Sequence, residues 1–178
     1  TEIKVGDIHS SVTEHPTQFT NDSRDILVGG IKHMGTGFSF HINALDLNVK
    51  LKGKIDRIDE VNGVLRIMDY KTGKVIASQL KINDWSLMGA DEKYAKSFQV
   101  LTYAYLYLNE NKLSLKELSL ESGIVSFKNL KDGFMPFNGG LITEEIISSF
   151  IVELDKLIIE IFDSGIPFQE KELPVFNY

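Results

Sequence analysis

The stretch LKGKIDRIDEVNGVLRIMDYKTGK, residues 51–74, decides the fold because it combines a turn signal with an unusual load of charge. The dipeptide Asn62-Gly63 is typical of a two-residue β-hairpin turn, since both residues tolerate positive φ angles. A turn there sets Val61 opposite Val64, and the other opposed pairs follow from that register. The register predicts these further pairs: Asp56 with Asp69, Lys54 with Lys71, and Asp59 with Arg66.

The predicted pairing of Asp56 with Asp69 indicates that this hairpin has a chemical role. Residues two apart on a strand share a face, so Lys71 is expected beside Asp69. Opposed residues have Cβ atoms about 5 Å apart, and like charges at that distance destabilise a sheet. A divalent cation removes the repulsion, and Mg²⁺ typically binds one or two carboxylates together with water and phosphate oxygens. We therefore interpret the stretch as a metal site whose lysine stabilises developing negative charge.

A second interpretation is a set of ion pairs on a solvated face. Hairpin geometry alone does not decide between this interpretation and a metal site. Asp59 and Arg66 are expected to form such a pair. Ile58 and Ile67 are predicted on the same face as the acids, which argues against a fully solvated face. A β-bulge in either strand would shift the register and separate the carboxylates.

Composition limits the classes of protein to be considered. The 178 residues are 43% hydrophobic and 25% charged, which predicts a globular chain. The net charge is −6, from 19 Lys and Arg against 25 Asp and Glu, so nucleic-acid binding through bulk positive charge is not expected. The absence of Cys excludes iron–sulphur ligation within these residues and fits a cytoplasmic location. No apolar run is long enough to span a bilayer, so no membrane association is expected.

Hydrophobic periodicity predicts strands, then a helix, a strand and a second helix, which is an α/β order. We expect residues 1–178 to form a single domain with its core at about 37–170, while residues 1–36 show no clear element. Thr1 stands where an initiator Met would be, so the chain is expected to be a fragment of a larger protein. The predicted elements are strands at 38–53 and 121–130, helices at 91–111 and 143–165, and irregular segments at 78–94 and 131–140.

The segments GKIDRID and RIMDYKTGK resemble the nuclease domain of the RecB/AddB group in the PD-(D/E)XK superfamily. By this resemblance, Asp56 matches the first metal-binding aspartate, Asp69 the second acid, and Lys71 the catalytic lysine. Members also carry a Gln-x-x-x-Tyr motif on a downstream helix, which Gln99 and Tyr103 match. These two residues share a helix face because they are four positions apart. The stripe expected to pack on the sheet is Phe98, Leu101, Tyr105 and Leu108.

The resemblance implies a restriction-endonuclease-like core, with a mixed central β-sheet flanked by α-helices. It implies Mg²⁺- or Mn²⁺-dependent hydrolysis of DNA phosphodiesters by an exonuclease or helicase–nuclease that acts in repair or recombination. Asp56 and Asp69 would hold the metal, and Lys71, Gln99 and Tyr103 would complete the catalytic set. Further domains or a helicase subunit are the expected partners besides DNA. Tyr70 is expected to pack on the opposite face of its strand.

The sequence departs from the family pattern ahead of the first strand. Members usually carry an acid or a histidine on an earlier helix, in a Gly-x-x-(Ile/Leu)-His context. Gly6 and His9 stand one residue closer together than in that pattern, so His9 is only a candidate third metal ligand, with His41 as the alternative. His15 and His33 have no such context. If the third ligand is absent, the expectation changes to an inactive remnant of the fold that serves DNA binding or partner contact.

Overall fold

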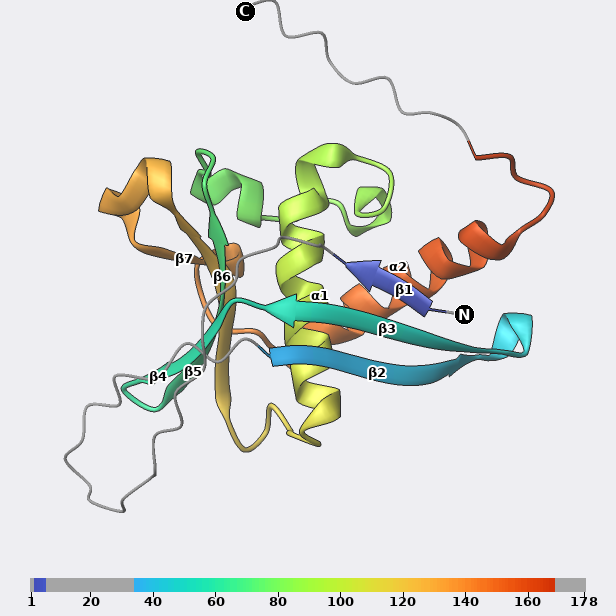
Figure 1. The fold of residues 1–178 in the computed structure, drawn as a ribbon, viewed down its shortest axis with the longest axis horizontal. Coiled ribbons are helices and arrows are strands. Elements are labelled where there is room, and N and C mark those ends of the chain that lie inside the picture. The colour runs from blue at the N-terminus through green and yellow to red at the C-terminus, as the bar shows by residue number, and fades with distance from the viewer. Residues whose placement is uncertain (1, 6–33, 169–178) are drawn as a thin grey trace, which may run out of the picture.

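The computed structural model describes residues 2–5 and 34–168, and Figure 1 shows how their helices and strands are arranged. The strands are β1 (Glu2–Val5), β2 (Met34–Ile42), β3 (Leu47–Ile55), β4 (Arg57–Val61), β5 (Val64–Lys71), β6 (Ser119–Ser126) and β7 (Phe134–Pro136). The α-helices are α1 (Ala95–Glu110) and α2 (Glu144–Phe162). Short 3₁₀ segments fill the connections, including η2 (Ala77–Leu80), η3 (Trp85–Leu87), η4 (Glu92–Tyr94) and η5 (Phe127–Asp132).

The strands form two hydrogen-bonded groups, ordered β1-β3-β2 and β4-β5-β6-β7. In the first, β1 runs parallel to β3 and β2 antiparallel to it. In the second, β5 and β6 are parallel, and β4 and β7 flank them antiparallel. Each group is therefore mixed, and helices flank both. The α/β prediction of a mixed sheet flanked by helices is confirmed.

Asp56 alone separates β3 from β4, so the chain leaves one strand group and enters the other at that residue. The predicted hairpin register holds from the turn at Val61–Val64 to the last pair, Arg57–Met68. The predicted pairing of Lys54 with Lys71 is wrong, because Lys54 lies in β3 and pairs with Gly35 of β2. The Asn62-Gly63 turn sets the pairing of β4 with β5 only as far as the bend at Asp56. Before that bend, β3 pairs with β2 instead.

Residues 38–53 form a hairpin and not the single strand that the sequence predicted. A 3₁₀ turn at Asn43–Leu45 reverses the chain, and Asp46 follows with a φ of 48°. Asp is among the few residues other than Gly that adopt this conformation readily, so the reversal needs no glycine. The predicted loop at 131–140 likewise contains a short strand, β7, at the edge of its sheet.

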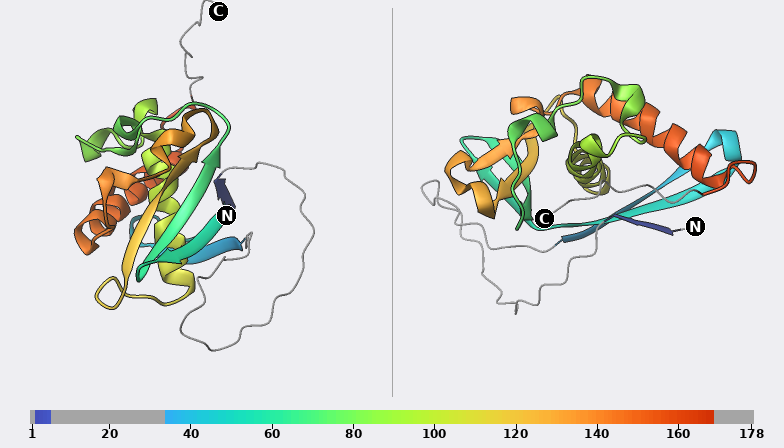
Figure 2. Two further views of the ribbon diagram at one scale, coloured as in Figure 1. Left: turned by 90° about the vertical axis from the view of Figure 1, so that its left-hand side faces the viewer. Right: turned by 90° about the horizontal axis from the view of Figure 1, so that it is seen from above.

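Helix α1 forms the centre of the core. It contacts β2, β3, β5 and β6 as well as α2, and Figure 2 shows it end-on in the angle between the two strand groups. The predicted stripe is buried or packed on the core, but the opposite sides of α1 are buried too. Val100, Ala104 and Leu106 are all 0% exposed. A helix enclosed by strands and by a second helix has no wide solvent face, and a single amphipathic stripe underestimates its burial.

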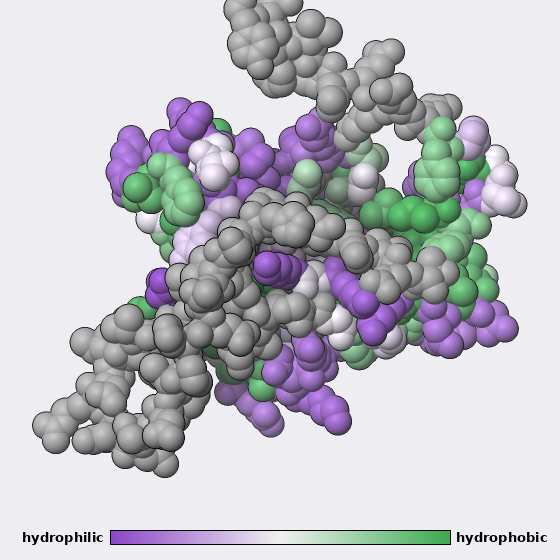
Figure 3. Space-filling view, in the orientation of Figure 1, coloured by the Kyte–Doolittle hydropathy of each residue, from purple (hydrophilic) through white to green (hydrophobic). Residues whose placement is uncertain are grey.

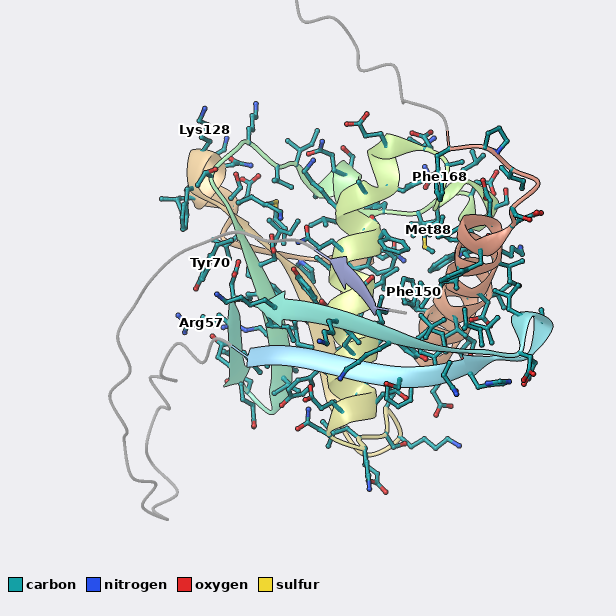
Figure 4. All side chains as sticks on the ribbon, turned by 45° about the vertical axis from the view of Figure 1, so that its right-hand side comes forward. Arg57, Tyr70, Met88, Lys128, Phe150 and Phe168 are labelled. Carbon is teal, nitrogen blue, oxygen red and sulfur yellow. The ribbon has the colours of Figure 1, made fainter. Side chains whose placement is uncertain are left out.

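Helix α2 covers α1 and begins where the sequence predicted. Thr143 accepts a hydrogen bond from the backbone N–H of Ile146 at 3.3 Å, and Glu144 and Glu145 occupy the first turn. Both features stabilise a helix N-terminus. Phe150 of α2 packs against Tyr105 of α1, with ring centroids 6.0 Å apart, and Figure 4 shows Phe150 on the side of α2 that faces α1.

The described part of the molecular face in Figure 3 is mixed in polarity. Hydrophilic side chains lie along its lower edge, and hydrophobic ones gather toward the right, where α2 and the turn between β2 and β3 lie. Within the described residues, no helix combines the length and apolar character needed to cross a membrane.

Candidate nuclease site

The predicted site residues meet where the chain bends at Asp56, beside the C-terminal end of β5 and the first half of α1. On β5, Ile67 and Asp69 alternate with Met68 and therefore face the same side of the sheet. Ile67 belongs to the hydrophobic core and is 0% exposed. Asp69 is 3% exposed, so the fold holds a carboxyl group at the margin of its core.

Lys71 and Gln99 both contact the Asp69 carboxylate. Lys71 Nζ lies 2.8 Å from Asp69 Oδ2, and Gln99 Nε2 donates a hydrogen bond of 3.1 Å to Asp69 Oδ1. Within the described residues, no group donates a hydrogen bond of regular geometry to Oδ2. That oxygen meets the ammonium of Lys71 as an ion pair and keeps capacity for a further positive partner.

Tyr103 extends the contact chain by one residue. Gln99 Nε2 donates to Tyr103 Oη at 2.9 Å, one helical turn away. Tyr103 is 2% exposed, and burial, with the negative charges of Asp69 and Asp56, raises its pKa to about 12. Its hydroxyl is therefore neutral at any ordinary pH. Gln99 links this neutral phenol to the charged pair of Asp69 and Lys71.

Gly53 makes room for this arrangement, a role that the sequence motif alone did not reveal. A Cβ atom at Gly53 would lie 3.0 Å from Cε1 of Tyr103 and 3.1 Å from Cδ1 of Leu106. The absence of a side chain on β3 therefore lets α1 approach the strand closely. The glycine that opens the GKIDRID segment was the available signal, but its partner on α1 is distant in sequence.

Asp56 is fixed by the backbone of the opposite strand. Its Oδ2 accepts a hydrogen bond of 2.9 Å from the N–H of Tyr70, which lies between Asp69 and Lys71. Burial raises the pKa of the Asp69 carboxyl above its ordinary value, Lys71 opposes that rise, and the negative charge of Asp56 adds to it. The predicted cross-strand pair of Asp56 and Asp69 is not formed, because the β4–β5 ladder ends at Arg57–Met68, but the Asp56 carboxylate still lies near enough to Asp69 for its charge to act on it.

The donor set fits a small divalent cation. Asp56 and Asp69 offer carboxylate oxygens, and Oδ2 of Asp69 lacks a regular hydrogen-bond donor among the described residues. Mg²⁺ commonly binds through one or two carboxylates with water and phosphate oxygens as its other ligands. Among residues 2–5 and 34–168, no group of three or more His, Cys, Asp or Glu side chains could hold a metal. A metal site in this part of the chain would therefore rest on two carboxylates and no third His, Cys, Asp or Glu side chain.

The histidines do not complete this set within the described structure. His41 lies on β2, and its ring contacts Asn48 at 3.3 Å and Asp46 at 3.5 Å. Those partners belong to the end of the β2–β3 hairpin and not to the acidic pair. His9, His15 and His33 lie outside the described residues.

Tyr70 points away from the acids, as expected for a packing residue. Its ring stacks on Phe127, with centroids 5.5 Å apart and planes 25° apart. A hydrogen bond with Tyr70 raises the pKa of Arg57, and Figure 4 shows these two side chains on the same side of the sheet. Asp59 forms the predicted ion pair with Arg66, with Nε of Arg66 2.8 Å from its carboxylate. The outer face of the hairpin is thus the ion-paired face, and the inner face carries the acids of the site.

Comparison with known proteins gives one result. A family model described as the PD-(D/E)XK nuclease superfamily matches residues 9–172. A search of curated proteins and a search of solved structures returned no match. The match spans the bend at Asp56, both helices and every strand from β2 to β7.

Proposed function

Since the chain belongs to the PD-(D/E)XK nuclease superfamily, we propose that it hydrolyses phosphodiester bonds in DNA with the help of Mg²⁺ or Mn²⁺. Membership supports a nuclease, and the mixed sheet flanked by helices agrees with a restriction-endonuclease-like core. The observation that carries the proposal for this chain is the Asp69 carboxylate. It is 3% exposed, paired with Lys71, bound by Gln99 and close to a second acid. Such a cluster is costly for folding alone, because buried like charges destabilise a domain.

Asp56 and Asp69 would hold the metal ion through their carboxylate oxygens. When bound, the ion supplies stabilisation of charge on the phosphate and lowers the pKa of a coordinated water. Oδ1 of Asp69 is engaged by Gln99, so Oδ2, which meets Lys71 as an ion pair, is the oxygen that would also face the metal. The hydrogen bond from the Tyr70 N–H holds the Asp56 carboxylate beside it.

Lys71 is the residue of this chain that stabilises negative charge during the reaction. Its ammonium lies 2.8 Å from Asp69 Oδ2, where it neutralises the acid, and the Lys71 side chain is 20% exposed. An ammonium in that place stabilises negative charge as it develops on the phosphoryl oxygens. Gln99 orients the carboxylate, and the neutral Tyr103 accepts the second hydrogen bond of Gln99.

We further infer a RecB/AddB-type enzyme, an exonuclease that works with a helicase subunit or further domains in DNA repair or recombination. The order of GKIDRID, DYKTG and Gln-x-x-x-Tyr in the chain supports this subfamily. The contact between Gln99 and Asp69 supports the idea that the third motif acts together with the second.

A second candidate is a nuclease fold without catalysis that serves DNA binding or partner contact. The observation in its favour is that the described residues supply two carboxylates and no larger metal-binding group. The two candidate functions predict different effects of divalent ions on the protein. An enzyme binds the ion and cleaves, whereas a non-catalytic domain need do neither.

Calorimetric titration with Mg²⁺ and Mn²⁺, paired with cleavage of labelled single-stranded DNA on the same samples, tests the proposal. The variants are wild type, Asp56→Ala/Asp69→Ala, and Asp59→Asn as a control from the outer face of the hairpin. We expect metal binding and cleavage in wild type and the control, and neither in the double variant. Binding without cleavage would favour the non-catalytic candidate. Cleavage that survives in the double variant would refute the site.

A further inference from the structure

The loop that follows Lys71 is held by two buried polar side chains from the adjacent strand and its extension. Ser126 ends β6 and is 0% exposed, and Asn129 lies in η5 and is 8% exposed. Both belong to a small group of buried polar residues in the described structure. The function derived so far uses neither of them.

Both side chains bond to the backbone of the same short loop. Ser126 Oγ donates to the carbonyl of Gly73 at 2.8 Å and accepts from the N–H of Val75 at 3.2 Å. Asn129 Nδ2 donates to the carbonyl of Val75 at 3.2 Å, and it also contacts Asp132. We call Ser126 and Asn129 the loop clamp. Its hydrogen bonds pair backbone groups that have left the sheet ladder, and those of Val75, which is 1% exposed, would otherwise be buried without partners.

The clamp begins at the last rung of the ladder that carries the site. Strands β5 and β6 are parallel, and their final pair is Lys71 with Ser126. Beyond that pair, the β5 strand loses its ladder bonds, and the end of a strand frays unless something holds it. The clamp supplies hydrogen bonds to the backbone of Gly73 and Val75, so it fixes the chain on the C-terminal side of Lys71.

We propose that Ser126 and Asn129 are positioning residues that hold the end of β5 so that the Lys71 ammonium stays on the Asp69 carboxylate. Lys71 has a long, flexible side chain, and its 2.8 Å contact with Asp69 depends on where its own backbone is fixed. The Asp69 backbone lies inside the ladder, whereas Lys71 is its terminal residue. Loss of the clamp therefore releases the lysine before it releases the acid. The catalytic consequence of this inference rests on the proposed nuclease function, but the positioning itself does not.

Ser122 offers a closely matched control. It lies on the same strand and the same face, is also 0% exposed, and its Oγ also donates to a backbone carbonyl. The carbonyl belongs to Val100 on α1, at 2.7 Å, and not to the loop after Lys71. Ser122→Ala therefore removes an equivalent buried hydrogen bond without touching the clamp.

The first readout is the reactivity of the Lys71 amine in the full chain without metal. Trace labelling with an amine-reactive reagent, mapped by mass spectrometry, gives a modification rate for each lysine. We expect a several-fold faster rate at Lys71 in Ser126→Ala, a wild-type rate in Ser122→Ala, and recovery in Ser126→Thr, which keeps the hydroxyl. Equal rates at Lys71 in wild type and Ser126→Ala would overturn the inference. If thermal melting shows that Ser126→Ala does not fold, Asn129→Ala takes its place with the same expected result.

The second readout is DNA cleavage with Mg²⁺ or Mn²⁺. We expect Ser126→Ala to lower kcat by about 10- to 100-fold with little change in KM, because small misplacements of a catalytic group cost rates of that order. Ser122→Ala should keep the wild-type kcat. Equal losses in the two variants would overturn the inference in favour of a purely structural role. If wild type does not cleave DNA, the proposed function fails, and the Lys71 labelling rate alone decides the inference.

Discussion

Gln99 of the central helix donates a hydrogen bond of 3.1 Å from Nε2 to Oδ1 of Asp69, the buried acid of β5. This bond joins two residues that lie 30 positions apart in the chain. It occupies one carboxylate oxygen and leaves Oδ2 to Lys71 and to the metal ion proposed above. The helix therefore sets which oxygen of Asp69 is available for chemistry.

Gln99→Ala is expected to reduce metal affinity or kcat by about 10- to 100-fold, the usual cost of losing a group that orients a metal ligand. The Asp69 carboxylate then loses the hydrogen bond from α1 to Oδ1 and is held, within the described structure, by the ion pair of Oδ2 with Lys71. Calorimetry with Mg²⁺ and steady-state cleavage of labelled DNA measure the two effects. Asn109→Ala is the control, because it removes a side-chain bond of the same helix to the Tyr105 carbonyl at 2.7 Å. Wild-type affinity and rate in Gln99→Ala would contradict the orienting role.

Asp69→Asn is expected to raise the melting temperature near pH 7 in metal-free buffer. Burial raises the pKa of Asp69 in the folded state, whereas an unfolded Asp titrates near about 3.9. Between these pKa values the folded protein binds more protons than the unfolded chain, so stability falls as pH rises. Asn cannot ionise, and the gain should disappear below about pH 4. For a domain of this size, each kcal/mol corresponds to about 2–4 °C in Tm.

Added Mg²⁺ should reverse this order of stability. An ion that binds only the folded state raises the melting temperature by mass action, and wild type has both Asp56 and Asp69 to bind it. The Asp69→Asn variant should gain little from the same addition. A calorimetric melt at pH 7 with and without Mg²⁺ checks both results. An equal Mg²⁺ effect on the two proteins would place the ion away from Asp69.

Tyr103 is expected to stay protonated well above the usual titration range of tyrosine. Burial raises its pKa to about 12, and the charges of Asp69 and Asp56 act in the same direction. The pH–rate profile should therefore show no inflection near pH 10 from this residue, where an ordinary tyrosine ionises. NMR titration of ¹³C-labelled tyrosine, with Tyr103→Phe to assign the signal, measures the pKa directly. A midpoint near 10 would show that the phenol is solvated and not enclosed by α1 and β3.

The sequence predicted those parts of the fold and site that depend on neighbours in the chain. Asn62-Gly63 fixed the hairpin register from Val61–Val64 to Arg57–Met68, because a two-residue turn determines its own flanking pairs. Thr143 marked the start of α2 for the same local reason. The assignment of Asp56, Asp69 and Lys71 to one site stays a prediction until metal binding is measured. The ion pair of Lys71 with Asp69 and the bond from the Tyr70 N–H to Asp56 are the contacts that support it.

What the sequence did not predict depends on contacts between distant segments. Asp56 ends one strand group and begins another, so Lys54 pairs with Gly35 and not with Lys71. That choice is made by β2, whose sequence gives no partner-specific signal. The reversal at Asp46 was missed because it uses a non-glycine residue with positive φ. The clamp by Ser126 reaches 53 residues back to Gly73, a relation that no periodicity encodes.

Gly53→Ala is expected to destabilise the fold by about 1–3 kcal/mol, the usual cost of inserting a methyl group into a well-packed core. The new Cβ would stand 3.0 Å from Cε1 of Tyr103 and 3.1 Å from Cδ1 of Leu106, so β3 and α1 would have to move apart. Because Tyr103 accepts a hydrogen bond from Gln99, the displacement should also weaken metal binding at Asp69. Gly37→Ala on neighbouring β2 is the control, since its Cβ would meet the flexible side chain of Lys52 at 3.3 Å. Urea unfolding and Mg²⁺ calorimetry on both variants make the comparison. Equal losses of stability and metal affinity in the two would show that Gly53 has no special role beneath Tyr103.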